Sequence, residues 1–201
     1  MTVTLEPFGD AALRVRLPEG APARAVFESL RALPGVIDAV VTERHALVTF
    51  DPSAPPGDVQ GAIARALAAP ASASEPRTHS IAVRYDGPDL DDVARAAGVT
   101  REQVIALHTQ AAYVVAAIGF VPGFAYLRGL DPRLVIPRRP TPRPRVAAGS
   151  VAIAGAYTGV YPLASPGGWH LIGVATGVSL FDARSGATLA LGDRVRFEVS
   201  P

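Results

Sequence analysis

Glycine and proline divide the second half of the chain into short segments, which constrains the fold more than any other feature. The 50 residues from Gly119 to Gly168 contain eight glycines and eight prolines. Proline removes a backbone hydrogen-bond donor and glycine weakens the interior of a helix or strand, so long regular elements are excluded there. From Tyr113 onward short apolar runs alternate with these breakers, and Arg194–Val199 alternates strictly between apolar and polar residues. This pattern predicts a β-barrel or sandwich.

The first 70 residues have a different periodicity, typical of a small α/β unit. Their apolar spacing predicts strands and helices in the order strand, helix, strand, strand, helix. The expected segments are Ala11–Leu17, Pro22–Leu33, Val36–Val41, His45–Phe50 and Asp58–Ala69. This order predicts a ferredoxin-like N-terminal domain over residues 1–70.

A small, polar, proline-containing stretch at residues 71–78 is interpreted as a linker, followed by a second domain over residues 79–201. That domain opens with an alternating strand near His79. Asp89 precedes a helical apolar pattern and is expected to begin a helix. Thr100 and Gln103 have the spacing of a capping box, so a further short helix is predicted to end near His108. The overall fold class is therefore α+β, with an α/β domain followed by a β-barrel domain.

The composition excludes several kinds of chemistry. The chain has 201 residues, 49% of them hydrophobic, and it contains no cysteine, no lysine and no asparagine. Disulfides, thiol nucleophiles, Schiff-base lysines and the lysine of a P-loop are thus excluded. With four histidines and no cysteine, no metal site is expected. A net charge of +1 gives no reason to expect nucleic acid as a partner.

Residues 1–13 lack the basic and apolar regions of a signal peptide. Two long uncharged stretches, 110–127 and 146–181, are interrupted by glycine, proline or polar residues and do not resemble membrane spans. A cytoplasmic protein without membrane contact is therefore expected.

The segment Pro132–Phe181 contains no acidic residue but five arginines. They are Arg133, Arg138, Arg139, Arg143 and Arg145. One interpretation is a binding site for an anionic partner such as a phosphate or carboxylate. The other is a solvated loop whose arginines pair with acids elsewhere in the chain, and the pattern favours neither.

Aromatic residues gather near the same loops and suit either the wall of a pocket or a partner surface. This group is Phe120, Phe124, Tyr126, Tyr157, Tyr161 and Trp169. His108, at a predicted helix end, suits proton transfer or a favourable interaction with the helix dipole.

A set of ordered motifs resembles one protein family. The motifs are Gly119–Leu130 (GFVPGFAYLRGL), Pro137–Val146 (PRRPTPRPRV), Ala148–Val151 (AGSV), Gly159–Pro162 (GVYP) and Ser165–Trp169 (SPGGW). The chain resembles the allophanate hydrolase subunit 1 family, also described as the B subunit of 5-oxoprolinase and as the Kip-type inhibitor of a sporulation kinase. With further matches at Phe8–Asp10, Glu102–Thr109 and Leu191–Phe197, the resemblance covers nearly the whole chain.

The resemblance implies a ferredoxin-like domain followed by a cyclophilin-like β-barrel. It also implies one component of an ATP-dependent 5-oxoprolinase, a hydrolase that opens the lactam of 5-oxo-L-proline to L-glutamate. The expected partners are a C subunit of the allophanate hydrolase subunit 2 type and an A subunit of the lactam-utilisation type. ATP is expected to be bound by the complex.

We expect His108 to be catalytic. Substrate or anion binding is assigned to Arg138, Arg143, Arg145, Ser150, Gly167 and Gly168. A pocket or interface is assigned to Phe120, Pro122, Phe124, Tyr126, Tyr161 and Trp169. Two alternatives stay open: an inhibitor that binds a histidine kinase, and a component of urea or allophanate metabolism related to the carboxyltransferase of urea carboxylase.

Overall fold

A computed structural model describes residues 4–68 and 75–200. The chain divides into two compact units, Met1–Pro76 and Arg77–Pro201. Half of the predicted linker, residues 71–74, lies outside the described residues, and its last residue, Thr78, is the first residue of a strand. No helix in the described part of the chain has the length and apolar character needed to cross a membrane.

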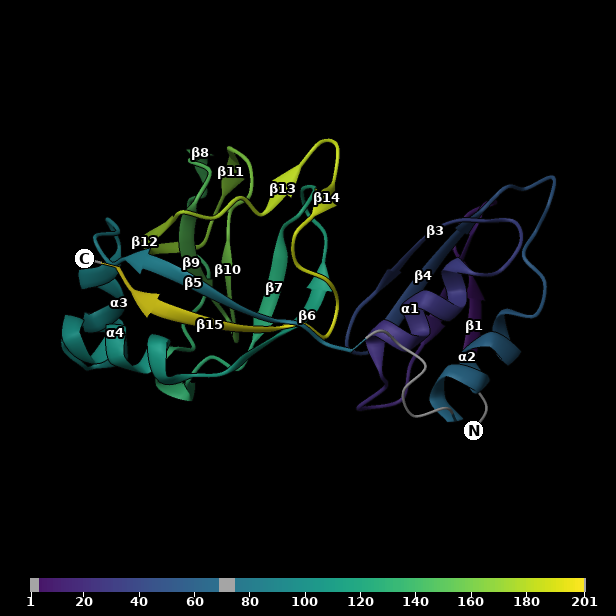
Figure 1. Ribbon diagram of the computed structural model, residues 1–201, viewed down its shortest axis with the longest axis horizontal. Helices are drawn as coiled ribbons and strands as arrows, with labels where there is room; N and C mark the ends of the chain where they lie inside the picture. The colour runs from purple at the N-terminus through teal and green to yellow at the C-terminus, as the bar shows by residue number, and fades with distance from the viewer. Residues whose placement is uncertain (1–3, 69–74, 201) are drawn as a thin grey trace. The chain divides into compact units, whose positions relative to one another are not determined.

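The first unit is a four-stranded antiparallel sheet with two helices, shown in purple and blue in Figure 1. Its elements are β1 (Thr4–Pro7), β2 (Ala12–Arg16), α1 (Ala23–Arg31), β3 (Val36–Val41), β4 (His45–Phe50) and α2 (Val59–Ala68). Val15 and Val48 of the sheet are fully buried, as are Leu30 of α1 and Ile63 of α2, so this unit has its own core. The arginines that alternate with Val15 in β2 are exposed.

The strand order is β1-β2-β4-β3. Because β2 and β3 are each antiparallel to β4, they are parallel to one another with β4 between them, the arrangement of a split βαβ unit. The predicted α/β unit is thus confirmed. The strand β1, which adds an edge beside β2, was not expected from the sequence. Its four residues are too few to show an alternating pattern, and the last of them is proline, which sheets accept mainly at edges.

The second unit contains a closed barrel of seven strands in the order β10-β7-β6-β15-β5-β12-β9, which confirms the predicted barrel. The barrel strands are β5 (Thr78–Arg84), β6 (Tyr113–Ile118), β7 (Ala125–Arg128), β9 (Ser150–Ala154), β10 (Tyr157–Val160), β12 (His170–Thr176) and β15 (Arg194–Val199). The pairing of β5 with β15 is parallel, and the other six pairings of the barrel are antiparallel. Two short ribbons lie along the upper edge of the barrel in Figure 1: β8 (Arg143–Val146) with β11 (Ser165–Gly167), and β13 (Phe181–Asp182) with β14 (Gly186–Ala187).

Two helices, α3 (Leu90–Ala97) and α4 (Arg101–Gln110), lie at one end of the barrel, and a 3-10 turn spans Pro132–Leu134. The predicted capping box is confirmed. The Thr100 hydroxyl accepts from the Gln103 backbone N–H at 3.2 Å, and the Gln103 side chain accepts from the Thr100 N–H at 2.9 Å. Asp89 precedes α3 as predicted, but its side chain makes no capping hydrogen bond.

Candidate functional site

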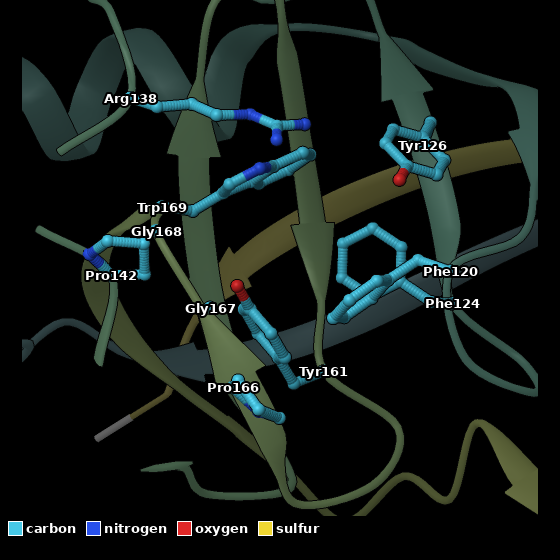
Figure 2. Close-up of a pocket in the computed structure, with 10 residues that line it drawn as sticks. All are labelled: Phe120, Phe124, Tyr126, Arg138, Pro142, Tyr161, Pro166, Gly167, Gly168 and Trp169. Carbon is cyan, nitrogen blue, oxygen red and sulfur yellow. The ribbon is translucent and has the colours of Figure 1, made fainter. Parts of the chain in front are cut away.

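A cavity of about 230 Å³ opens in the wall of the barrel unit (Figure 2). Its lining comes from the loop before β7, from β7 itself, from the segment before β8, and from the region between β10 and β12. The lining residues are Phe120, Phe124, Tyr126, Arg138, Pro142, Tyr161, Pro166, Gly167, Gly168 and Trp169. The predicted pocket group thus comes together here, with the exception of Pro122, which does not line the cavity.

The apolar wall is a set of aromatic rings in edge-to-face contact. Phe124 lies at its centre, with its ring centroid 5.0 Å from that of Tyr126, 5.3 Å from Tyr161 and 5.3 Å from Trp169. Phe124, Tyr161 and Trp169 are buried and belong to a single packed cluster. Because such contacts hold the rings in fixed positions relative to each other, the aromatic wall is preformed. It presents flat, apolar ring surfaces to the cavity.

Phe120 lies at the mouth of this pocket in an unusual backbone conformation. Its φ is 77°, and it is the one non-glycine residue with positive φ among residues 4–68 and 75–200. The side chain is 59% exposed, yet its ring contacts Phe124 and Tyr161 at centroid distances of 5.6 and 6.5 Å. A strained backbone that holds a large apolar ring at a pocket mouth is typical of a binding site.

Arg138 and Tyr161 supply polar groups to the pocket. Figure 2 shows Arg138 running above the Trp169 indole and the Tyr161 phenolic oxygen pointing toward the Trp169 side of the pocket. Within the described part of the chain, no carboxylate lies at ion-pair distance from Arg138, so its charge is available to a ligand.

Burial raises the pKa of Tyr161 above its usual value, and this outweighs the opposite effects of Arg138, the Trp169 backbone N–H and Arg143. The phenol therefore stays protonated at neutral pH and can donate a hydrogen bond.

Asp89 is the acidic partner of the arginine-rich segment. Its side chain is 3% exposed, and one of its oxygens accepts from Arg139 Nη1 at 2.8 Å and from Arg143 Nη2 at 2.7 Å. The other oxygen accepts from the backbone N–H of Leu171 at 2.7 Å. Burial acts to raise the pKa of Asp89, but the arginines and this N–H together hold it below its usual value.

The second interpretation, in which the arginines pair with acids outside the segment, therefore holds for three of the five arginines, and the anion-binding interpretation stays a prediction. Arg139 and Arg143 pair with Asp89, and Arg133 pairs with Asp131. Arg138 lines the pocket, whereas Arg145 is exposed on β8 and does not.

Among the other predicted binding residues, Gly167 and Gly168 line the pocket, and Ser150 does not. Ser150 is buried in β9, where its backbone carbonyl accepts from the Tyr161 N–H at 2.9 Å.

His108 lies in the core of the barrel unit with no exposed surface. Its Nδ1 is 2.7 Å from the Tyr85 hydroxyl and its Nε2 is 2.9 Å from the Thr158 hydroxyl. Burial lowers the pKa of His108 to about 3, so the ring is neutral at pH 7. Its catalytic role stays a prediction, and this position favours a structural role, because a ligand in the pocket has no path to a ring that is fully enclosed.

Three residues of the site, Asp89, Pro142 and Pro166, were not expected from the sequence. A signal for Asp89 was present: one of the two interpretations of the five arginines was that they pair with acids elsewhere in the chain. Sequence spacing alone does not show which acid it is, because Asp89 is separated from Arg139 by 50 positions.

A second hollow, of about 280 Å³, lies on the first unit and is lined by Glu6, Arg14, Arg16, Arg44 and His45. All five side chains belong to exposed or half-exposed residues, and Arg14 pairs with Glu6 across neighbouring strands. Across residues 4–68 and 75–200, no group of three or more His, Asp or Glu residues is placed to hold a metal ion.

The sequence profile of the family "Carboxyltransferase domain, subdomain C and D" matches residues 3–191. The B subunit of 5-oxoprolinase from Bacillus subtilis is 36% identical over 96% of this chain and 91% of its own length. The corresponding B subunit from Escherichia coli O157:H7 is 53% identical over 55% of this chain and 51% of its own.

The crystal structure of TTHA0988 has a TM-score of 0.80 and 41% identity, covering 94% of this chain and 40% of that one. PH0987 from Pyrococcus horikoshii has a TM-score of 0.58 and 30% identity, with 98% and 97% of the two chains covered. The urea amidolyase of K. lactis shares the fold, with a TM-score of 0.72 at 18% identity over 98% of this chain and 15% of that one. The chain therefore belongs to the carboxyltransferase subdomain C and D family, together with the B subunits of 5-oxoprolinase.

Proposed function

We propose that this chain is the B subunit of an ATP-dependent 5-oxoprolinase and that its aromatic pocket binds the lactam substrate. In the overall reaction 5-oxo-L-proline, ATP and two waters give L-glutamate, ADP and phosphate, and the lactam C–N bond breaks. The family membership supports the activity. The observation that carries the role of this chain is a preformed aromatic pocket into which Arg138 brings a guanidinium.

The pocket has the chemistry that 5-oxo-L-proline requires. The substrate is a flat five-membered ring with a carbonyl, an N–H and one carboxylate. The ring packs against the aromatic wall around Phe124, and the carboxylate pairs with Arg138. The hydroxyl of Tyr161 donates a hydrogen bond to the lactam carbonyl, whose oxygen gains negative charge when the ring is attacked.

ATP has a distinct task in this reaction. A lactam carbonyl is a poor electrophile, and transfer of a phosphoryl group to its oxygen makes attack by water feasible. We assign the nucleotide to the complex as a whole and give this chain the binding and orientation of the lactam. Because the chain contains no lysine, cationic side-chain contacts to any phosphoryl group from this chain at neutral pH must come from arginine.

We further propose two partners, a C subunit of the allophanate hydrolase subunit 2 type and an A subunit of the lactam-utilisation type. The TTHA0988 chain supports the association with further protein, since the part that matches this chain is 40% of its length.

The decisive experiment is reconstitution. The chain is co-expressed with the two companion chains, and glutamate release from 5-oxo-L-proline is measured with and without ATP. We expect ATP-dependent glutamate release that requires all three chains. Release that is unaffected by omitting this chain would contradict the proposal. ATP turnover that depends on urea and not on 5-oxo-L-proline would instead identify a role in urea metabolism.

Inhibition of a histidine kinase is the second candidate function, and one observation favours it. The Phe120 ring is more than half exposed at the pocket mouth, as expected for a residue at the centre of a protein interface. Kinase autophosphorylation that falls on adding wild-type chain but not Phe120→Ser, together with no 5-oxoprolinase activity on reconstitution, would select this function.

A further inference from the structure

We propose that Asp89 is the positioning residue of the pocket: it holds the arginine segment so that Arg138 faces the ligand, and it thereby makes the pocket select ligands that carry a carboxylate. This inference rests on the proposed function, because it concerns the same pocket. Asp89 does not line the cavity and so acts through other residues.

The side-chain hydrogen bonds of Asp89 go to two distant segments of the chain, the arginine segment and the start of β12, rather than to its own helix. It precedes α3 in the usual place of a capping residue, yet it makes no capping bond. Its carboxylate accepts instead from Arg139, Arg143 and the Leu171 N–H, at 2.7 to 2.8 Å. These partners are 50, 54 and 82 positions away along the chain. Because its three side-chain hydrogen bonds all go to distant residues, the Asp89 carboxylate holds the arginine segment and the start of β12 in fixed positions.

The tied segments form one wall of the pocket. Arg139 directly follows Arg138, and its backbone N–H donates to the carbonyl of Gly168 at 2.8 Å. Arg143 pairs with Gly167 across the β8–β11 ribbon. Both glycines line the cavity, so Asp89 fixes their segment as well as the one that carries Arg138.

Electrostatics explains why a neutral side chain at position 89 would not hold the two arginines in place. Two guanidinium groups that are 29% and 24% exposed share the one carboxylate. Arg139 Nε and Arg143 Nη1 are buried without a hydrogen-bond partner among the described residues. Without the negative charge, two partly buried cations would repel each other, and one would have to leave toward solvent. Because Arg139 directly follows Arg138, this movement would displace Arg138.

The test uses the full chain and its single tryptophan. Trp169 lines the pocket, so its fluorescence reports ligand binding directly. Two ligands are titrated: 5-oxo-L-proline, and 2-pyrrolidinone, which has the same lactam ring but no carboxylate. The ratio of their dissociation constants measures selection for the carboxylate, and a loss of stability is expected to weaken the binding of both ligands equally, which a control variant checks.

Asp89→Asn is expected to reduce the preference for 5-oxo-L-proline at least about tenfold, the size of one lost charge-assisted contact. Binding of 2-pyrrolidinone is expected to stay within about twofold, well below the effect of one hydrogen bond. Arg139→Gln keeps the Asp89–Arg143 pair and removes the tether next to Arg138. It is the milder disturbance of the fold and should lower the ratio in the same direction, so it decides the question if Asp89→Asn does not fold.

The matched control is Asp193→Asn. Asp193 is 1% exposed. Its carboxylate accepts hydrogen bonds from the backbone N–H groups of Arg77 and Ala190, each at 3.0 Å, and one of its oxygens lies 3.0 Å from His79 Nε2. None of these partners lines the pocket, so this variant should lose stability but keep the wild-type ratio.

The outcomes separate the two proposals. If the wild-type chain prefers 5-oxo-L-proline and the folded Asp89 and Arg139 variants keep that preference, the positioning role is wrong and the pocket assignment stands. If the wild-type chain shows no preference for the carboxylate, the pocket assignment fails and the positioning role fails with it. If Asp193→Asn changes the ratio as much as Asp89→Asn, the effect is one of general stability and the positioning role is wrong.

Discussion

Arginines gather in two places in this protein, and the two places differ in what surrounds them. On the first unit, Arg14 pairs with Glu6 where both side chains are 51% exposed. In the barrel unit, Asp89 is 3% exposed and holds two arginines. Water screens the first pair, whereas the second pairing lies where charge is weakly screened. The same guanidinium and carboxylate groups therefore lie at the surface of one unit and hold the wall of a pocket in the other.

The largest expected difference concerns folding stability. Asp89→Ala should lower the free energy of unfolding of the barrel unit by about 3 kcal/mol, because it leaves two partly buried cations without a counter-charge. Glu6→Ala is the matched change in the exposed pair and should leave the unfolding midpoint unchanged within error. Urea denaturation followed by Trp169 fluorescence and by circular dichroism measures both. Equal effects of the two substitutions would show that burial does not distinguish the clusters.

The next prediction compares activity. Arg138→Gln should reduce kcat/KM of the reconstituted enzyme by about 10- to 100-fold, the effect of losing a hydrogen bond to a charged group. Arg16→Gln removes an exposed arginine from the other cluster and should leave kcat/KM unchanged. Steady-state assays of glutamate release at several substrate concentrations test this. A large effect of Arg16→Gln would mean that the hollow on the first unit takes part in the reaction.

The pH dependence of stability should differ between the units because of His108. Its pKa is about 3 in the folded barrel unit against an ordinary value of 6.5, so in acid the unfolded chain binds a proton that the folded unit does not. The contribution of His108 therefore leaves the barrel unit at its full stability above pH 6.5, and this stability falls as the pH decreases from 6.5 toward 3, by at most about 1.4 kcal/mol per pH unit.

In His108→Gln this slope should disappear between pH 6.5 and 5, which urea titrations at a series of pH values measure. Asp89, whose pKa is lowered, adds a loss of stability only at still lower pH, as its carboxylate becomes protonated. An unchanged slope in His108→Gln would contradict the assignment of the effect to this ring.

The smallest expected effect comes from two neighbouring glycines. A Cβ on Gly167 would overlap the Tyr161 hydroxyl, whereas a Cβ on Gly168 would meet Pro142 carbons at 3.7 Å, an ordinary contact distance. Gly167→Ala should therefore cost about 1 kcal/mol and shift the Trp169 emission as Tyr161 moves. Gly168→Ala should leave the unfolding midpoint and the emission spectrum close to wild type. Similar spectra for both variants would show that Tyr161 does not need this space.

Local features of the sequence predicted much of the fold. Thr100 and Gln103 begin α4 through bonds that span three positions, and the alternation in Arg194–Val199 gives the bounds of β15 as the structure has them. Such patterns arise from neighbours along the chain and need no knowledge of the rest of the fold.

The candidate site was less predictable because its contacts join distant residues. Asp89 begins a helix as its sequence context predicts, but its carboxylate bonds to arginines 50 and 54 positions away. For His108, the sequence shows a polar residue at a helix end and does not show that the Tyr85 and Thr158 hydroxyls enclose it. The aromatic group was found because several of its members crowd into one short stretch of sequence.

The parallel pairing of β5 with β15 has a consequence for the order in which the protein forms during synthesis. Thr78 pairs with Arg194, and β15 lies between β5 and β6 in the barrel. During synthesis on the ribosome, all the described strands of the unit Met1–Pro76 have been made long before residues 194–199 emerge. Until then β5 has an open edge that is free to pair with other chains, so translation speed and chaperone access at this stage should affect the yield of the barrel unit more than that of the first unit.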